Sequence, residues 1–550
     1  MTGGAPASPV RGDGGPVREQ RDLRVPENLQ LPALVAMVPG AVDEVRDEPV
    51  TFRQLQHDTA DLRLARWGAD LRVRLDGPDR GWRLALPADE GTGAADVVDR
   101  AVAADETGDD VPDELLDLVR PLVREAAVRP VTELRTTRTS LHLRDARGQE
   151  LATVHDDLVE AVLPRGGVRR LRRLRIVGQG PPPDAGRAVT RLTDAITAAV
   201  EAGEGPPVGD ATGATTAARR TAGDETGPGD LPRGLPRGAE PFGLPGAGPA
   251  DVVVPRRPGR HGTAGDVLTY ALAAHVRSFL LADVAVRRDR PDAVHRLRVA
   301  GRTLRSTLRT FTPLCDEGWA HDLRDRLGGA ADALGAVRDT EVLYARLEAD
   351  AERLSPADRV RVLPALDELL RPRLLDARAS ALRELRSDRY LQLLVDLVEA
   401  TRHPRLSAKA DAKAAAVLPA LVADDWAGLV HAVRRLRSER LDPRDPAWHR
   451  ARILAKRARY GAEATVPALG GRARRWAHEL SEVTDLLGRL HDGVVAAGVL
   501  QDAAAGADGP SGFALGRLLA LQDAAVEAAA DDFLERWPRV RRRLERRGLG

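Results

Sequence analysis

Cysteine and aromatic residues are scarce in this chain of 550 residues. Cys315 is the only cysteine, so neither an intramolecular disulfide nor a cysteine-based zinc site can form, and we expect it to be a core residue. Aromatic residues make up 3% of the chain, so a large core must rest on Leu, Val and Ala. No run of 18 or more residues is apolar, and residues 1–16 lack the apolar core of a signal peptide. These absences predict a soluble, cytoplasmic protein without a membrane segment.

Charge is abundant but balanced. Charged residues make up 30% of the chain and its net charge is +1, which excludes a uniformly basic protein and leaves room for local patches. The lysines are Lys409, Lys413 and Lys456, and arginine supplies the rest. Arginine suits bidentate contacts to phosphate, but the same bias is typical of a GC-rich genome. No Ser-His-Asp order, P-loop or GxGxxG motif stands in the strand–turn–helix context that its chemistry needs.

One stretch, residues 291–309, predicts a helix with a basic face. At about 100° per residue, its basic side chains fall within an arc of roughly 80°, opposite an apolar arc. Pro291 and Asp292 favour a helix start at this point. A single row of cations is more typical of a solvated helix face than of a binding site. The basic arc consists of His295, Arg298, Arg302, Arg305 and Arg309.

The same row recurs further along the chain. His449, Arg452, Lys456 and Arg459 stand at the same relative positions, 0, 3, 7 and 10. The segment 334–339, Leu-Gly-Ala-Val-Arg-Asp, is echoed by 487–492, Leu-Gly-Arg-Leu-His-Asp. The two histidines are 154 residues apart and the two aspartates 153. Two motifs that repeat at nearly one offset indicate a duplicated unit.

The composition divides the chain into four parts. Residues 1–16 are predicted to be disordered, and residues 17–202 alternate in short runs typical of a sheet-rich barrel or sandwich. A Gly/Pro-rich linker is predicted over 203–262. An all-α region of two similar bundles follows over 263–546, with repeats at about 264–400 and 413–543. Strands are expected over 51–57, 69–75, 82–86, 131–137, 140–143, 151–155 and 168–177, and helices over 112–127 and 184–202. Further helices are expected over 265–286, 291–311, 317–335, 338–353, 356–386, 388–401, 413–437, 445–463, 471–488, 491–505 and 511–546.

The doubled basic helix resembles the CHAD family (conserved histidine α-helical domain). Each half of that domain carries His-x-x-Arg-x-x-x-Arg/Lys-x-x-Arg, and the Leu-Gly-x-x-Arg-Asp turn matches at 334–339, with His491 replacing the Arg in its second copy. Gly301 and Thr303 depart from the family pattern, and a glycine inside a helix costs about 1 kcal/mol relative to alanine. The resemblance, over about 264–543, implies binding of inorganic polyphosphate. The residues implied are His295, Arg298, Arg302, Arg305, Arg309, Arg338, His449, Arg452, Lys456 and Arg459.

The N-terminal region resembles a CYTH domain, the tunnel-like β-barrel of triphosphate-processing enzymes. The match lies in 57–74, 81–87, 135–139 and 154–157. The metal-binding Glu-x-Glu-x-Lys of that family is missing: Arg18, Gln20 and Asp22 occupy its place, and Arg173 and Arg175 stand where glutamates are expected. Because Mg²⁺ needs oxygen ligands, triphosphatase activity is not expected. Six arginines could line a metal-free tunnel or face outward as a solvated surface, and the outward arrangement is favoured: Arg72, Arg74, Arg135, Arg138, Arg173 and Arg175.

The sequence therefore predicts a multidomain α+β, non-enzymatic polyphosphate-binding protein without cofactor or metal, acting as a targeting module or sensor at polyphosphate granules. A CYTH-type triphosphatase is the first alternative. Nucleic-acid binding is the second, disfavoured because only one aromatic residue, Tyr460, lies on the basic faces, although weak competition by nucleic acid is expected. Protonation of His295 and His449 by a bound polyanion predicts tighter binding as pH falls toward 6.

Several residues allow a second interpretation. Asp339 and Asp492 are lone carboxylates, which favours a helix N-cap or an arginine-orienting role over metal ligation. Tyr460 could donate to phosphate or be half-buried between helices. Asp156 and Asp157 have no second carboxylate pair in view, so we expect them to be structural.

Overall fold

The computed structural model describes residues 20–77, 80–86, 96–100, 110–162, 167–179, 182–202, 209–210, 248–259 and 261–548. Its contacts divide the chain into two units, one of residues 1–115, 126–223 and 235–250, the other of residues 116–125, 224–234 and 251–550. The disorder predicted for residues 1–16 and most of the predicted linker lie outside the described residues. In the described part of that linker, Ala250 and Val252 are buried.

The first unit is an antiparallel sheet. Its strand order is β10–β1–β9–β8–β7–β3–β4–β5–β6, with β2 added beside β7. The long central strands are β7 (Arg129–Asp145), β8 (Glu150–Val162) and β9 (Val168–Gly178). The remaining strands are β1 (Gln20–Val25), β2 (Ala41–Arg46), β3 (Val50–Asp58), β4 (Asp70–Arg74), β5 (Gly81–Leu86), β6 (Asp96–Arg100) and β10 (Gly209–Asp210).

The predicted closed barrel is an open sheet over the described strands. Its terminal strands β6 and β10 are only five and two residues long, and no pairing between described residues joins them. Helix α3 (Pro182–Ala202) packs on one face, where its Leu192 and Ile196 meet Leu174 and Ile176 of β9. Three short helices also occur, η1 (Leu34–Met37), α1 (Arg63–Trp67) and α2 (Asp113–Val123). The division assigns the residues of α2 from Leu116 onward to the second unit.

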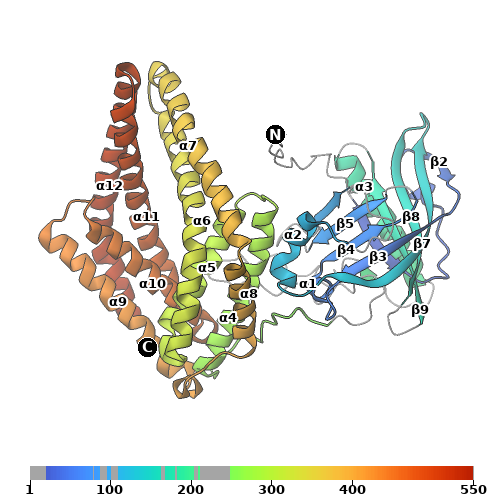
Figure 1. Cartoon of the computed structure of the whole chain (residues 1–550), viewed down its shortest axis with the longest axis horizontal. Coiled ribbons are helices and arrows are strands. Elements are labelled where there is room, and N and C mark those ends of the chain that lie inside the picture. Colours follow the sequence, from blue (N-terminus) through green and yellow to red (C-terminus); the bar gives the residue numbers. More distant parts are fainter. Residues whose placement is uncertain are drawn as a thin grey trace, which may run out of the picture. The chain divides into compact units, whose positions relative to one another are not determined.

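The second unit is all-helical over its described residues from 261 onward (Figure 1). Its first half comprises α4 (Ala264–Arg287), α5 (Ala293–Thr310), α6 (Glu317–Ala351), α7 (Pro356–Leu385) and α8 (Asp388–Arg402). Its second half comprises α9 (Ala414–Glu439), α10 (Pro446–Leu469), α11 (Gly471–Gly506) and α12 (Gly509–Arg547). The order α4–α7 is repeated by α9–α12, as the duplicated motifs predict.

Three predicted breaks are wrong. In the sheet, the strands expected over 131–137 and 140–143 form the single strand β7. Helices expected over 317–335 and 338–353 form the single helix α6, and those over 471–488 and 491–505 form α11. The two Leu-Gly segments are therefore helix interiors rather than turns. A Cβ at Gly335 would lie 2.7 Å from Nη1 of Arg298, so a larger residue there would force this guanidinium to move.

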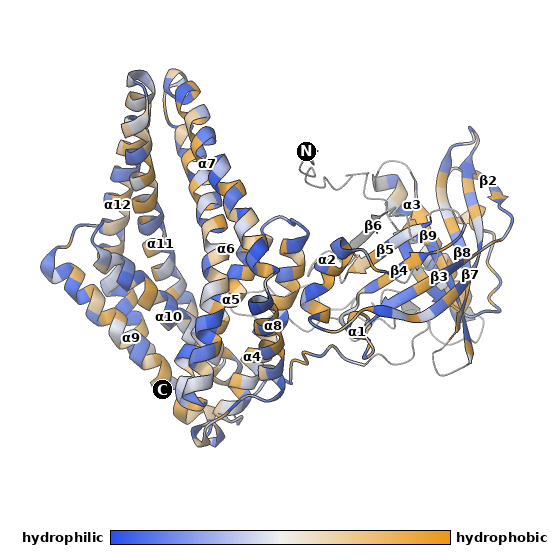
Figure 2. Cartoon of the chain, viewed as in Figure 1, coloured by the Kyte–Doolittle hydropathy of each residue, from blue (hydrophilic) through white to orange (hydrophobic). Residues whose placement is uncertain are grey.

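Apolar faces hold the halves together, and hydrophobic and hydrophilic residues alternate along the long helices (Figure 2). The hairpins α6–α7 and α11–α12 share one core cluster that includes Leu347, Leu366, Leu500 and Leu515. Helices α9 to α12 build a second cluster. Its aromatic members include Trp448, Trp476, Phe533 and Trp537. Burying a side chain of this size contributes roughly 1.5–3 kcal/mol, so these clusters fix the position of α10 against α11.

Two helices of the described chain, α4 and α9, are long and apolar enough to cross a membrane by length and composition. Their most apolar windows have a mean hydropathy of 1.3, and 72% of that window is buried inside the protein in α4 and 28% in α9. A core helix of a soluble protein meets the same criterion, so two such helices are weak evidence of a membrane segment.

Candidate functional site

Helix α5 presents its basic arc because its opposite face is buried. Leu297, Leu304 and Leu308 are fully buried, which fixes the rotation of the helix. Asp292 precedes the helix in the left-handed conformation, and its side chain makes no capping hydrogen bond. Close packing explains the glycine at position 301 inside the helix, since a Cβ on Gly301 would lie 3.2 Å from the ring of Phe279.

Helix α10 presents the second basic arc in the same way. Ala451, Ala455 and Ala458 are fully buried and belong to the apolar core of the second half. The helix starts at Pro446, capped by the side chain of Asp445, which accepts from the backbone N–H of Ala447 at 2.8 Å. It also packs against α5, so the two basic arcs come from neighbouring helices.

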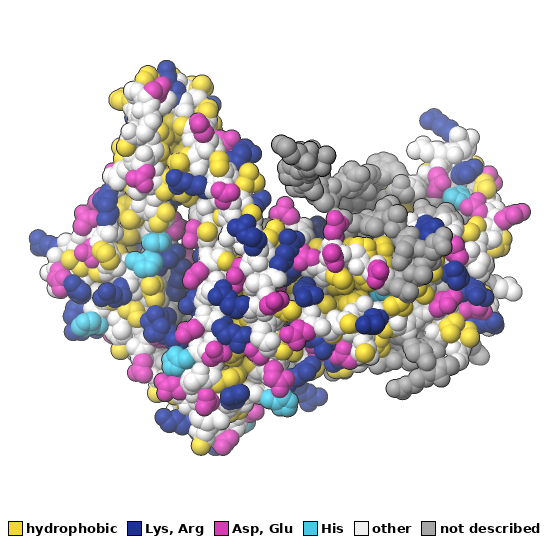
Figure 3. Space-filling view, viewed as in Figure 1, with side chains coloured by type: hydrophobic (Ala, Val, Ile, Leu, Met, Phe, Trp, Pro, Cys, Tyr) yellow, Lys and Arg dark blue, Asp and Glu magenta, His cyan; other side chains and the backbone are white. Residues whose placement is uncertain are grey.

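Four cations from the two arcs form the central cluster: Arg298 and Arg302 of α5, and Arg452 and Lys456 of α10. Burial, followed by the charges of Arg452 and Arg302, lowers the pKa of Lys456 to about 7. Cations of both helices therefore lie close enough to Lys456 to add to the effect of its burial. In the space-filling view, Lys and Arg side chains gather in a hollow between the two halves of the helical unit, with His side chains beside it (Figure 3).

Two carboxylates border the central cluster. Asp339 of α6 accepts a hydrogen bond from Arg298 at 3.3 Å, and Asp492 of α11 lies 3.9 Å from Arg452. Because both aspartates lie in helix interiors, the N-cap alternative is wrong for them, and the contacts fit the arginine-orienting role. No group of three or more potential metal ligands occurs among the described residues, in line with their lone placement.

Two arginines of the central cluster keep unused donors. The Nε atoms of Arg302 and Arg452 are buried and have no hydrogen-bond partner among the described residues. The Arg302 guanidinium instead lies 5.3 Å from the ring centroid of Tyr460, which is 5% exposed. Tyr460 is thus buried between the helices, the second of the two alternatives. A buried donor without a partner costs free energy that an incoming anion would recover.

The remaining predicted residues do not all lie in the central cluster. Arg459 is held by Glu463 at 2.8 Å and by the hydroxyl of Thr484 at 3.1 Å. Arg305 and Arg309 are exposed further along α5. Arg338 of α6 lies 3.6–3.7 Å from carboxylates of Glu341 and Asp292.

Histidines stand at both sides of the central cluster. Burial and then the charge of Arg338 lower the pKa of His295, and burial, Arg452 and Lys456 lower that of His449. Nδ1 of His449 lies 3.4 Å from Nδ1 of His491, and their ring centroids are 4.7 Å apart. Burial, followed by Arg452 and His449, lowers the pKa of His491 to about 4. His491 is not among the predicted site residues, although the repeat aligns it with Arg338.

The sheet unit does not present its arginines as a solvated face. Arg72, Arg74 and Arg173 are 5–9% exposed, so the favoured outward arrangement is wrong for these three, whereas Arg135 is exposed. The Arg74 guanidinium lies 3.9 Å from the ring centroid of Phe52.

Two of these arginines form ion pairs with Asp157. It is fully buried, and Arg138 donates two hydrogen bonds to it at 2.6 and 2.9 Å, while Arg173 donates one at 3.0 Å. Burial alone would raise the pKa of Asp157, but these two arginines hold it well below its ordinary value. Asp156 pairs with Arg172 at 2.7 Å. Both aspartates are therefore engaged in ion pairs.

The residues present do not fit the divalent metal of CYTH enzymes. Arg173 lies in β9 against the buried Asp157, and Arg175 stands opposite His155 in the ladder. Both oxygens of Asp157 already accept from arginines, so no carboxylate at this position remains to ligate a hard cation.

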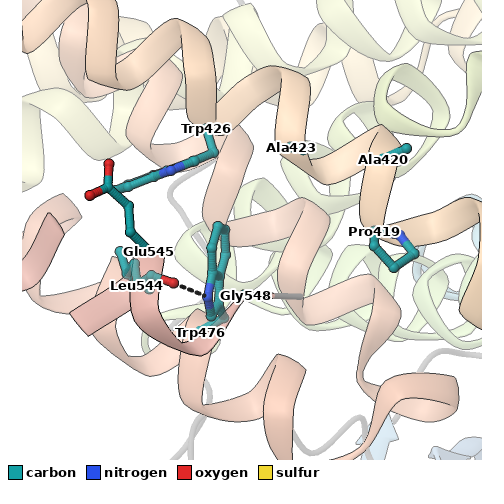
Figure 4. Close-up of a pocket in the computed structure, with 8 residues that line it drawn as sticks. All are labelled: Pro419, Ala420, Ala423, Trp426, Trp476, Leu544, Glu545 and Gly548. Atoms are coloured by element: carbon teal, nitrogen blue, oxygen red, sulfur yellow. Dashed lines mark hydrogen bonds between the residues drawn. The ribbon is translucent and has the colours of Figure 1, made fainter. Parts of the chain in front are cut away.

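A separate pocket of about 370 Å³ lies among α9, α11 and α12 (Figure 4). Trp426 and Trp476 line it, and the indole N–H of Trp476 donates to the carbonyl of Leu544 at 3.2 Å. Its only charged lining residue is Glu545. An apolar pocket with a carboxylate does not suit a polyanion, so it is distinct from the basic site.

Comparison with known proteins agrees with this architecture. The CHAD domain model matches residues 270–501. Uncharacterized protein Rv2226 of Mycobacterium tuberculosis strain H37Rv is 32% identical over 492 residues, which cover 83% of each chain. Uncharacterized protein MT2285 of strain CDC 1551 / Oshkosh is 31% identical over the same length and share.

The chain therefore belongs to the same family as these two mycobacterial proteins, and it carries a CHAD domain at residues 270–501. Its N-terminal sheet domain is consistent with a CYTH-like fold. Among solved structures, PptA from Streptomyces chartreusis is 24% identical, with a TM-score of 0.44, over 50% of this chain and 100% of that one. The CHAD domain from the plant Ricinus communis is 26% identical, with a TM-score of 0.39, over 50% of this chain and 93% of that one.

Proposed function

We propose that the helical unit binds inorganic polyphosphate at the central cluster between α5 and α10, without catalysis. The observation that carries the proposal is the gathering of Arg298, Arg302, Arg452 and Lys456, which lowers the pKa of Lys456 to about 7. Four cations held together against their mutual repulsion form a site that is completed by a dense anion. Membership among CHAD-domain proteins supports a polyphosphate-associated role.

The geometry favours a linear polyanion. Cations along each helix are one turn apart, about 5.4 Å, and polyphosphate carries charges spaced by a few ångströms. Arginine forks take two phosphate oxygens at once, which adds geometric specificity to charge attraction. The buried Nε donors of Arg302 and Arg452 would gain hydrogen-bond partners. The protein would serve in the cytoplasm as a targeting module or sensor at polyphosphate granules.

The proposal is tested by isothermal titration of long-chain polyphosphate into the full chain. The test variant reverses the four cations, Arg298→Glu, Arg302→Glu, Arg452→Glu and Lys456→Glu. The control variant reverses four exposed arginines of α7 and α9 that have the same total charge: Arg373→Glu, Arg383→Glu, Arg434→Glu and Arg437→Glu.

We expect binding by wild type and by the control, and loss of binding by the test variant with an unchanged circular dichroism spectrum. Affinity should fall steeply with salt, because bound phosphates release counterions. Wild type that does not bind polyphosphate at low salt would refute the proposal. Two further outcomes would redirect it: phosphate release with Mg²⁺ or Mn²⁺ would indicate an enzyme, and tighter binding of RNA would indicate a nucleic-acid-binding protein.

A further inference from the structure

Beyond the central cluster, the cationic stripe of α5 continues to Arg305 and Arg309, and these two arginines meet other partners. Burial, followed by the charges of Arg309, Arg324 and Arg305, lowers the pKa of Arg457 of α10, opposed by Asp425. Arg324 belongs to α6, and both α6 and α10 pack against α5. The guanidinium of Arg305 lies against α6, where Nη2 would be 3.4 Å from a Cβ added to Gly328. We call this set the distal cluster, and it consists of Arg305, Arg309, Arg324 and Arg457.

The distal cluster is poor in counter-charge. Over the part of the chain that the structure describes, none of its four guanidinium groups has a carboxylate within 4.0 Å. The nearby carboxylate of Asp425 accepts from the hydroxyl of Thr310 at 3.4 Å, and its pKa is raised by burial. Arg305 and Arg309 are exposed and Arg324 and Arg457 are half-buried, whereas the buried Arg173 pairs with Asp157. Four like charges that are close together and have no acid within ion-pair distance repel one another, and a bound anion would relieve this repulsion.

The second repeat has no equivalent of the distal cluster. Arg309 corresponds to Glu463 at the 154-residue offset, and Glu463 neutralises Arg459 at 2.8 Å. Arg457 corresponds to Thr303, which donates to its own helix at the carbonyl of Val299. On α10 the row of cations thus ends in an ion pair, whereas on α5 it continues. The duplicated fold has produced an asymmetric surface.

We propose that the distal cluster is a second subsite for the same polyphosphate chain. The chain would extend from the central cluster in one direction, along α5. This inference rests on the proposed function. Arg309 lies seven residues beyond Arg302 along α5, a rise of about 10 Å. With phosphates spaced by a few ångströms, a short oligomer seated on the central cluster does not reach Arg309, and a long chain does. The distal cluster thereby sets a preference for chain length.

The test compares two ligands, tripolyphosphate and long-chain polyphosphate, on the full-length protein. The test variant is Arg309→Ala combined with Arg457→Ala, and the matched control is Arg434→Ala combined with Arg437→Ala on the exposed side of α9. For the test variant we expect an affinity loss of about tenfold or more for the long chain, since charge-assisted hydrogen bonds to phosphate disappear. Its affinity for tripolyphosphate should be unchanged, and its salt dependence with the long chain weaker.

A gain-of-binding variant protects the test from a simple folding defect. Asp425→Asn removes the carboxylate beside Arg309 and Arg457, so it should tighten long-chain binding and leave tripolyphosphate binding unchanged. Equal losses for both ligands in the arginine variant, or no loss for either, would overturn the distal subsite. Failure of wild type to bind either ligand would instead overturn the proposed function itself.

Discussion

The unliganded protein should be more stable without the charge of Lys456. Burial and the neighbouring arginines lower the pKa of this residue from 10.5 to about 7. At about 1.4 kcal/mol per pKa unit the full shift corresponds to at most about 5 kcal/mol. Screening of the partly exposed ammonium group by water reduces this to roughly 2–3 kcal/mol. Lys456→Met keeps the length of the side chain and removes the charge, so it should raise the free energy of unfolding by roughly this amount at pH 7.

The pH dependence has a definite sign. Between pH 7 and about 10 the unfolded chain keeps the Lys456 proton while the folded protein has lost it. Because the unfolded state binds more protons, the stability of the wild type should rise with pH across this window. Below pH 7 the destabilisation is complete and constant. The advantage of Lys456→Met should therefore shrink as pH rises from 7 toward 10.

Urea unfolding, followed by circular dichroism in low salt, measures this effect. Guanidinium is unsuitable because it screens the charges concerned. Lys409→Met is the matched control, since Lys409 is exposed, and its stability should follow the wild type at every pH. Equal stabilities of Lys456→Met and wild type at pH 7 would refute the idea that the cluster is under electrostatic strain. The same variant should bind polyphosphate more weakly.

Two other substitutions test the neighbourhood of the cluster. Gly335→Ala should displace the guanidinium of Arg298 and weaken polyphosphate binding several-fold in titrations. Gly488→Ala is its control, because a Cβ at Gly488 would have no neighbour within 4 Å. This control should only stabilise α11, by about 1 kcal/mol in urea unfolding. His491→Arg should tighten binding at pH 8 more than at pH 6, because the neutral His491 must otherwise gain a proton from solution. His478→Arg, which is exposed on the same helix, is its control, and an equal effect of the two histidine variants would contradict a local role.

Hydrophobic periodicity was sufficient to predict the helical unit and most of the sheet. The apolar arc of α5 is buried where the spacing predicts, and the two-repeat order of helices followed from the duplicated motifs. The breaks near Gly335 and Gly488 were wrong because glycine favours turns locally, while tertiary packing kept α6 and α11 continuous. The open sheet could not be predicted, because the alternating pattern identifies strands but not whether the first and last of them pair.

The site was predictable as a face but not as a set of contacts. Helical spacing places cations on one side of α5 and of α10, and it does not say which of them meet. The pairing of Arg459 with Glu463 was available from their spacing of four residues. The approach of Arg457 and Arg324 to Arg309 could not be predicted from the sequence, because it depends on how α10 and α6 cross α5.

Duplication explains how two ordinary basic helices form one dense cationic cluster. A single row of cations in water attracts anions weakly, since solvent and salt screen each charge. When the apolar cores press α5 and α10 together, Arg302 and Lys456 face each other in a partly desolvated place, and each loses hydration that a polyanion can replace. The two repeats differ in the charged residues that follow this cluster. Glu463 ends the row on α10, whereas Arg309 extends it on α5 and meets Arg457 of α10. The duplicated fold therefore presents an asymmetric cationic surface, which is what the proposed polyphosphate path requires.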